Sequence, residues 1–428
     1  RGDRGVLGRG PGRPWRPGRL VCADLLVDAG GCAHGAAPGT FQGAPLPTTR
    51  AERTSDAETW TYADVMAFFD SLQRDHVPFV RQELGRTTEG RVLPLLILSR
   101  PQVSTPAEAK ALHRPIVYVQ ANIHAGEVEG KEALQALVRD LATTPNDVLD
   151  SIVLIAIPIY NADGNERFKS QAVNRTEQNG PERVGQRPNA KMLDLNRDYV
   201  KAEAPETRAS LAAFDKWDPD VFVDLHTTDG SFHGYALTYA PSLNPAAMRT
   251  GPYTMDSLLP ELRTRMQQRD GFAVFDYGNF DTQYEERDIT DTVKSGWYTY
   301  DHRPRFGTNY YGLRNRFSIL SEAFSHDPFE RRVKSTYAYV HEILSLVAER
   351  GARLREIEAA ADSDFGHGDY AQQIPIRSRL ITVPAREPVV FEVMKHTGDS
   401  SLTQPGLPRG FPPTGVLPSR VGRGHPTR

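Results

Sequence analysis

The chain has 428 residues, of which 39% are hydrophobic and 25% charged, and its formal net charge is −3. This composition is typical of a soluble globular protein with one large or two ordinary domains, and the small net charge does not favour a nucleic-acid partner or an anionic membrane surface. No stretch approaches about eighteen consecutive apolar residues, so we expect no integral membrane span.

The two ends of the chain differ in composition from its middle. Residues 1–49 are crowded with Gly, Pro and Arg, and residues 397–428 are similar, so both are predicted to be disordered tails. The only cysteines, Cys22 and Cys32, lie in the first tail, which excludes a disulfide framework or a cysteine-ligated zinc site from the body of the protein. Because the chain does not begin with methionine, we expect a fragment or a processed product.

Between the tails, short apolar runs alternate with helical patterns. A helix is predicted over 61–75, and strands and helices then follow in turn: strands over 92–99, 115–121, 151–160, 220–226 and 316–322, with helices over 129–143, 205–217 and 334–360. The strand runs are continuously apolar, which is typical of strands covered on both faces. We therefore predict an α/β layered fold over about 50–350, followed by an extension over 351–396 that we interpret as a truncated further domain.

The stretch NIHAGEVEGKEA (122–133) follows one of these strands and opens a helix. Its His124 and Glu127 have the spacing of a zinc pair, but about one such pair is expected by chance, and an ordinary helix N-terminus is the alternative. Their position favours a metal, because His226 and Glu322 end two further predicted strands, and strand ends of an open α/β sheet meet at one edge. Two histidines and a glutamate with an open fourth position make a catalytic zinc set.

Further motifs stand in order along the chain: LGRTTEGR (84–91), HAGE (124–127), YNADGN (160–165), LDLNRDY (193–199), DLHTTDG (224–230) and SILSEAF (318–324). Together they resemble the M14 family of zinc carboxypeptidases over about residues 60–350. The resemblance implies a three-layer α/β/α fold around a central mixed, mostly parallel sheet. It also implies an enzyme with one zinc ion per chain that hydrolyses the C-terminal peptide bond of peptides or proteins.

The resemblance assigns roles around the metal. The implied zinc ligands are His124, Glu127 and His226. Glu322 is the implied general base, which takes a proton from water and passes it to the leaving amine. Asp194 is expected to accept the remaining ring N–H of the first zinc histidine and so to orient it. For Asp224 two interpretations stay open, a similar role toward His226 and a place in a nearby polar network.

The resemblance also assigns substrate contacts. Asn196 and Arg197 match the family's clamp on the terminal carboxylate, for which a guanidinium offers two parallel donors. An upstream arginine is expected to stabilise the oxyanion, and Arg175 has the best spacing among Arg167, Arg175, Arg183 and Arg187. A capping tyrosine is expected at Tyr311, with Tyr300 and Tyr310 as alternatives.

Some residues depart from the family pattern. Gly126 stands where pancreatic-type members carry an arginine, so one contact to the substrate chain is missing. The segment 302–321 holds four arginines and no acid, so we expect the pocket to accept apolar or acidic C-terminal residues rather than basic ones.

The alternatives to a carboxypeptidase are a zinc deacylase or amidase of the same fold, acting on N-acyl amino acids or peptidoglycan peptides, and a non-catalytic homologue. The family resemblance favours an extracytoplasmic or secreted location.

Overall fold

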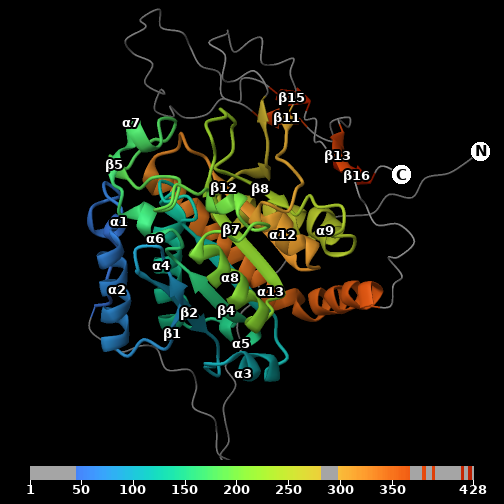
Figure 1. Ribbon diagram of the computed structural model, residues 1–428, viewed down its shortest axis with the longest axis horizontal. Coiled ribbons are helices and arrows are strands. Elements are labelled where there is room, and N and C mark those ends of the chain that lie inside the picture. Colours follow the sequence, from blue (N-terminus) through green and yellow to red (C-terminus); the bar gives the residue numbers. More distant parts are fainter. Residues whose placement is uncertain are drawn as a thin grey trace, which may run out of the picture. The chain divides into compact units, whose positions relative to one another are not determined.

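The computed structural model describes residues 45–280, 297–366, 378–381, 388–390, 416–418 and 423–426. Within them a central sheet of eight strands runs in the order β1-β2-β4-β3-β7-β12-β8-β9 (Figure 1). Its strands are β1 (Val80–Arg86), β2 (Val92–Leu98), β3 (Ile116–Ala121), β4 (Val153–Ile157), β7 (Val221–Thr227), β8 (Leu237–Pro241), β9 (Val274–Asp276) and β12 (Phe317–Ala323). The pairs β3–β4, β3–β7, β7–β12 and β8–β9 are parallel, and the others are antiparallel. The predicted mixed, mostly parallel sheet is confirmed.

The remaining elements connect and cover these strands. The α-helices are α1 (Arg50–Arg53), α2 (Tyr62–Arg74), α3 (Pro106–Ala111), α4 (Glu129–Thr143), α5 (Val148–Ser151), α6 (Ala162–Asn165), α7 (Gln171–Asn174), α8 (Pro205–Trp217), α9 (Thr250–Tyr253), α10 (Leu259–Arg265), α12 (Gly307–Leu313) and α13 (Phe329–Gly366). The segment η1 (Leu195–Arg197) is a 3-10 turn, and η2 (Thr254–Leu258) and η3 (Met266–Asp270) are π-helical. Outside the central sheet, short strands pair two by two: β5 (Lys169–Ser170) with β6 (Arg183–Val184), β10 (Asn279–Phe280) with β11 (Trp297–Tyr298), β13 (Ser378–Ile381) with β16 (Arg423–Pro426), and β14 (Pro388–Val390) with β15 (Val416–Pro418).

Alternating residues of the strands fill two separate cores, which produces three layers. In β3, Val117 and Val119 pack in the core shared with α2, α4 and α13, whereas Ile116 and Tyr118 pack in the core shared with α8 and α12. Burying each such side chain contributes about 1.5–3 kcal/mol, so both faces of the strand must stay apolar along this stretch. This explains why the strand runs in the sequence are continuously apolar rather than alternating.

The same alternation sets the side of the sheet on which polar residues emerge. In β7, Phe222 packs in the core with α8, so Asp224 and His226 lie on that face as well. In β12, Ile319 packs in the opposite core, so Leu320 and Glu322 share the face of Asp224 and His226. Two neighbouring parallel strands therefore bring a histidine and a glutamate to one face at their carboxyl ends.

The long helix α13 crosses residue 350, where the sequence predicts a domain boundary. It runs from Phe329 to Gly366, and Leu354 and Ile357, which lie beyond the boundary, pack in the main core. The expected division between 50–350 and 351–396 thus falls inside a packed helix. Farther on, Val389 packs against Tyr235 and the aromatic residues beside it. The predicted tails, 1–49 and 397–428, lie mostly outside the described residues. Residues 45–49 are described, and Thr49 among them is buried and caps α1.

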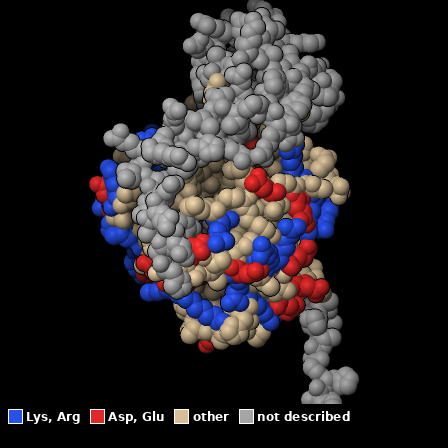
Figure 2. All heavy atoms as spheres, turned by 90° about the vertical axis from the view of Figure 1, so that its right-hand side faces the viewer, with Lys and Arg blue, Asp and Glu red and all other residues tan. Residues whose placement is uncertain are grey.

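The described surface carries charges of both signs. On the face drawn in Figure 2, basic and acidic side chains are interspersed, in keeping with the formal net charge of −3. No helix in the described part of the chain combines the length and the apolarity that a membrane span requires.

Candidate active site

The loop between β3 and α4 carries His124 and Glu127. It begins at Asn122, whose φ of 65° lies in the left-handed region, which asparagine adopts more readily than most residues. The amide of Asn122 donates to the carbonyl oxygens of Ala125 at 3.3 Å and Glu127 at 3.4 Å. These bonds hold a compact turn at the carboxyl end of β3, and the turn presents both side chains to the neighbouring strand β7.

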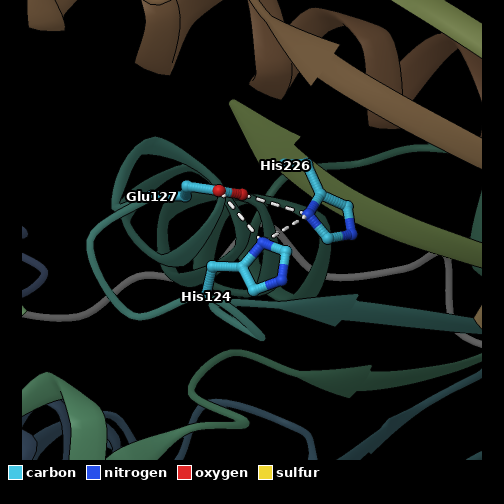
Figure 3. Close-up of side chains that lie close together, drawn as sticks. All are labelled: His124, Glu127 and His226. Carbon is cyan, nitrogen blue, oxygen red and sulfur yellow. Dashed lines mark hydrogen bonds and ion pairs between the residues drawn. The ribbon is translucent and has the colours of Figure 1, made fainter. Parts of the chain in front are cut away.

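His226 on β7 meets this loop (Figure 3). Glu127 Oε1 lies 3.0 Å from His124 Nδ1, Glu127 Oε2 lies 3.0 Å from His226 Nδ1, and the two Nδ1 atoms are 3.3 Å apart. Imidazole nitrogens and a carboxylate oxygen are ligands that zinc accepts, and bonds of about 2.1 Å to a tetrahedral ion separate its ligand atoms by about 3.4 Å. The observed spacing and the donor types therefore fit one zinc ion with an open fourth position.

Asp194 lies behind the first of these histidines. Its Oδ1 is 3.0 Å from His124 Nε2 and also accepts the backbone N–H of Asn196 at 2.9 Å. Burial opposes the charge of Asp194, but His124 and Arg187 hold the pKa of this carboxyl well below its usual range. An ionised Asp194 accepts the Nε2–H of His124, which leaves the Nδ1 lone pair directed at Glu127 and His226.

Asp224 combines the two interpretations that the sequence leaves open. Its Oδ2 lies 3.0 Å from His226 Nε2, and its Oδ1 accepts from Gln120 Nε2 at 3.2 Å. Burial would lower the pKa of His226, yet the charges of Asp224 and Glu127 raise it well above its ordinary value. Asp224 therefore lies beside the second histidine and belongs to a buried polar network at the same time.

Glu322 lies beside the three candidate ligands, in a cavity of about 250 Å³ that they line together. In the parallel pair of β12 with β7, Glu322 stands opposite His226. Burial raises the pKa of Glu322 to about 8, and the negative charges of Glu127 and Asp229 add to this effect. A carboxyl whose pKa lies near neutral pH can both accept and release a proton under ordinary conditions.

Asn196 and Arg197 line the same cavity. Asn196 Oδ1 accepts the backbone N–H of Gly307 at 2.9 Å, so its amide nitrogen is directed toward His226, whose Nε2 lies 3.4 Å away. The guanidinium of Arg197 stacks on the ring of Phe306, 4.2 Å from the ring centroid. This stacking orients the planar group while leaving the side chain 35% exposed, which is compatible with binding an anion.

Of the four arginines considered for the oxyanion, the structure brings Arg175 and Arg187 to the cavity. The side chain of Arg175 is only 5% exposed, whereas that of Arg187 is 38% exposed. Arg187 pairs with Asp194 at 3.0 Å and lies 3.6 Å from Glu127 Oε1. Arg167 and Arg183 are not among the residues that line the cavity. The accessible guanidinium beside the candidate metal ligands is therefore that of Arg187, not the predicted Arg175.

The structure does not bring Tyr311 to the cavity. Its ring is fully buried in the core beneath the sheet, stacked on Phe214 at 3.9 Å between centroids, and its hydroxyl lies 3.3 Å from Ser210 Oγ. The placement corrects the expectation that Tyr311 caps the substrate, because this ring would have to leave the core to do so. Tyr300, one of the alternatives, lines the cavity instead.

Several further cavity residues were not singled out from the sequence. They are Thr227, Asp229, Tyr277, Asn279, Thr299, Phe306, Thr308 and Leu320. Asp229 follows His226 in the DLHTTDG motif, so its proximity to the metal site could have been predicted. Tyr277 and Asn279 lie far from every motif in the sequence, and no local pattern marks them.

With this geometry established, a comparison with known families decides the assignment. The model of the M14 peptidases, described as zinc carboxypeptidases, matches residues 65–304, which is more than half of the chain. The chain belongs to the M14 family of zinc carboxypeptidases. The matched segment includes His124, Glu127 and His226, and the resemblance inferred from the ordered motifs is confirmed.

Relatives in this zinc carboxypeptidase family are distant. Carboxypeptidase 2 of Trichophyton tonsurans is 28% identical over 144 residues, which cover 33% of this chain and 23% of that protein. Carboxypeptidase 2 of Trichophyton rubrum is 27% identical over 163 residues, covering 37% of this chain and 27% of the relative. The match thus spans about a quarter of the length of these relatives.

A solved structure from Burkholderia mallei, assigned as a carboxypeptidase, aligns with a TM-score of 0.50 at 20% identity, covering 67% of this chain and 68% of the other. This likeness shows a shared fold. It agrees with the three-layer arrangement predicted for the zinc carboxypeptidase family.

Proposed function

We propose that this chain removes the C-terminal residue from peptides or proteins as a zinc-dependent exopeptidase. The observation that carries the proposal is that one cavity is lined by a zinc-type donor set, the half-buried Glu322 and an asparagine–arginine pair. The donor set supports a hydrolytic metal, the glutamate supports proton transfer, and the pair supports recognition of a free carboxylate.

His124, Glu127 and His226 would hold the zinc ion. When bound, zinc supplies Lewis-acid chemistry and lowers the pKa of a coordinated water to about 7. Asp194 and Asp224 keep the two imidazoles in the orientation that turns Nδ1 toward Glu127. The protein thereby directs its three donor atoms at one point before any ion arrives, which reduces the cost of ordering them.

Glu322 is the proposed general base. Its carboxylate takes a proton from the attacking water and returns it to the nitrogen of the leaving amine, so that the scissile C–N bond breaks without releasing an unprotonated amide anion. Arg187 is the proposed donor to the oxygen on which negative charge develops, because its guanidinium is accessible beside Glu127.

Asn196 and Arg197 are proposed to bind the terminal carboxylate of the substrate. An internal peptide bond offers no such group, so the pair restricts cleavage to the last bond of the chain. The cavity wall formed by Tyr277, Tyr300 and Leu320 is uncharged and supports acceptance of apolar end groups. Comparing peptides that end in Phe, Glu and Lys tests this preference, and fastest release of Lys would contradict it.

The test of the proposed function uses N-blocked dipeptides in two forms, one with a free carboxyl terminus and one amidated. We expect the zinc-loaded protein to release the C-terminal amino acid from the free form and to leave the amidated form intact. N-acyl amino acids and muropeptides are assayed beside them. Turnover of these alone, without dipeptide hydrolysis, would assign a deacylase or a peptidoglycan amidase instead.

A further inference from the structure

Arg175 lies against the loop of His124 and Glu127, in the space that a side chain at position 126 would fill. A Cβ atom built on Gly126 would lie 2.7 Å from Arg175 Cγ and 2.9 Å from the carbonyl oxygen of Gly185. Both separations are shorter than ordinary van der Waals contact. The absence of a side chain at Gly126 therefore makes room for an arginine that comes from a distant segment.

The guanidinium of Arg175 connects the two segments that carry the candidate metal ligands. Nη1 donates to Glu127 Oε1 at 3.0 Å, on the loop after β3. Nη2 donates to the carbonyl oxygens of Thr227 at 3.2 Å and Thr228 at 2.8 Å, immediately after His226. One planar group thus holds both chain segments at a set separation.

Gln178 completes this arrangement. Its Oε1 accepts from Arg175 Nε at 3.2 Å, and its Nε2 donates to the carbonyl oxygens of Gly126 at 3.2 Å and Gly180 at 3.1 Å. Gln178 is 2% exposed and the side chain of Arg175 is 5% exposed. Because Nε and both terminal nitrogens of Arg175 already donate to protein acceptors, little of the group is left for a substrate.

We propose that Arg175 is a positioning residue for the metal site, which holds the Glu127 carboxylate in its metal-binding orientation. The inference rests on the zinc site of the proposed function. Oε1 of Glu127 is held by Arg175, and Oε2 accepts the backbone N–H of Thr227 at 3.1 Å, so the carboxylate is fixed from both sides. Each oxygen then faces one histidine Nδ1, and this arrangement keeps the carboxylate and both nitrogens within reach of a single ion.

The test measures the zinc dissociation constant of the full chain by competition with a chelating dye. Arg175→Met keeps most of the side-chain volume and removes every donor, and we expect it to raise the dissociation constant by about 10–100-fold. Arg175→Lys keeps the charge and a single donor nitrogen in place of three, and we expect an intermediate value. Arg183→Met is the matched control, since Arg183 is exposed, lies outside the cavity and should leave zinc affinity unchanged.

A second variant separates positioning from a general loss of structure. Gln178→Ala should weaken zinc binding through Arg175 and through its own bond to Gly126, so the loss in the double variant Arg175→Met/Gln178→Ala should be smaller than the sum of the two single losses. The absorption spectrum of the cobalt-loaded protein should change in both single variants and stay as in the wild type in the control. Fully additive effects of the two substitutions would contradict a shared action on Glu127.

The outcomes distinguish this inference from the proposed function. If the wild-type protein binds no zinc, the proposed function fails. If the wild type binds zinc and a folded Arg175→Met variant binds it equally well or more tightly, only the positioning role is overturned. The thermal unfolding of the metal-free variants, compared with the metal-free wild type, establishes that each variant is folded.

Discussion

Glu322 on β12 stands directly opposite His226 on β7, and both side chains emerge on the same face of the sheet. This relationship depends on register, because a shift of one residue in either strand would turn one of the two side chains to the other face. The parallel pairing therefore places a base beside a metal ligand, and the packing of Phe222 and Ile319 in opposite cores maintains that register.

Glu322→Gln should abolish most of the turnover while leaving the metal site intact. An amide cannot accept the water proton, and general acid–base catalysis contributes about 100- to 10,000-fold to the rate. We expect kcat to fall within that range and the zinc content, measured by atomic absorption, to stay at that of the wild type. Undiminished kcat in a zinc-loaded variant would remove Glu322 from the reaction.

Zinc should stabilise the chain against heat, because a ligand that binds only the folded state shifts the unfolding equilibrium. At a free concentration of about 1,000 times the dissociation constant the gain is about 4 kcal/mol. We expect Tm to rise when zinc is added to chelator-treated wild type and to respond much less in His226→Ala, which lacks one donor. An equal rise in both proteins would place the bound zinc elsewhere.

Arg197→Met should weaken recognition of the terminal carboxylate. A hydrogen bond to a charged group contributes about 1.5–3 kcal/mol, which corresponds to about 10- to 160-fold in kcat/KM. We expect the preference for free over amidated dipeptides to shrink accordingly, mainly through KM. Arg303→Met serves as the control, since Arg303 is exposed and is not among the cavity residues. If Arg197→Met keeps the full preference, another group binds the carboxylate.

Substitutions of Tyr311 should affect stability rather than substrate binding. Tyr311→Ala removes a fully buried ring, for which a loss of about 3–5 kcal/mol in the free energy of unfolding is expected. Tyr311→Phe removes only the contact with Ser210 and should leave KM unchanged. Denaturant unfolding and steady-state kinetics measure the two effects. A several-fold rise in KM for Tyr311→Phe would show that this hydroxyl does contact the substrate.

Glu358 on α13 should make stability depend on pH. Burial raises the pKa of Glu358 to about 10, aided by the charge of Asp220. A carboxyl whose folded pKa is raised contributes fully below its unfolded pKa of about 4.3, and that contribution is lost as pH rises toward the folded value. Glu358→Gln cannot ionise, so its Tm relative to wild type should be higher at pH 9 than at pH 5. An equal difference at both pH values would contradict this.

The elements that local pattern can specify are predicted well. Helices α4 (129–143) and α8 (205–217) have the predicted bounds, because charged or proline-containing first turns precede clear apolar periodicity. The strands β1, β8 and β9 were not predicted, because they are short or mixed in polarity. β1 and β9 are the two edge strands of the sheet, where one neighbour is missing and a strand need not be apolar throughout, whereas β8 is a short strand between β12 and β9.

The sequence by itself determines the ordered motifs, the apolar strands and the residue types needed to bind a metal, transfer a proton and recognise a carboxylate. Only the tertiary structure decides among residues of one type: Arg187 rather than Arg175 is accessible, and Tyr300 rather than Tyr311 lines the cavity. Motifs depend on contacts between near neighbours in the chain. Exposure depends on which distant side chains pack together, as where Gly126 leaves the space that Arg175 occupies.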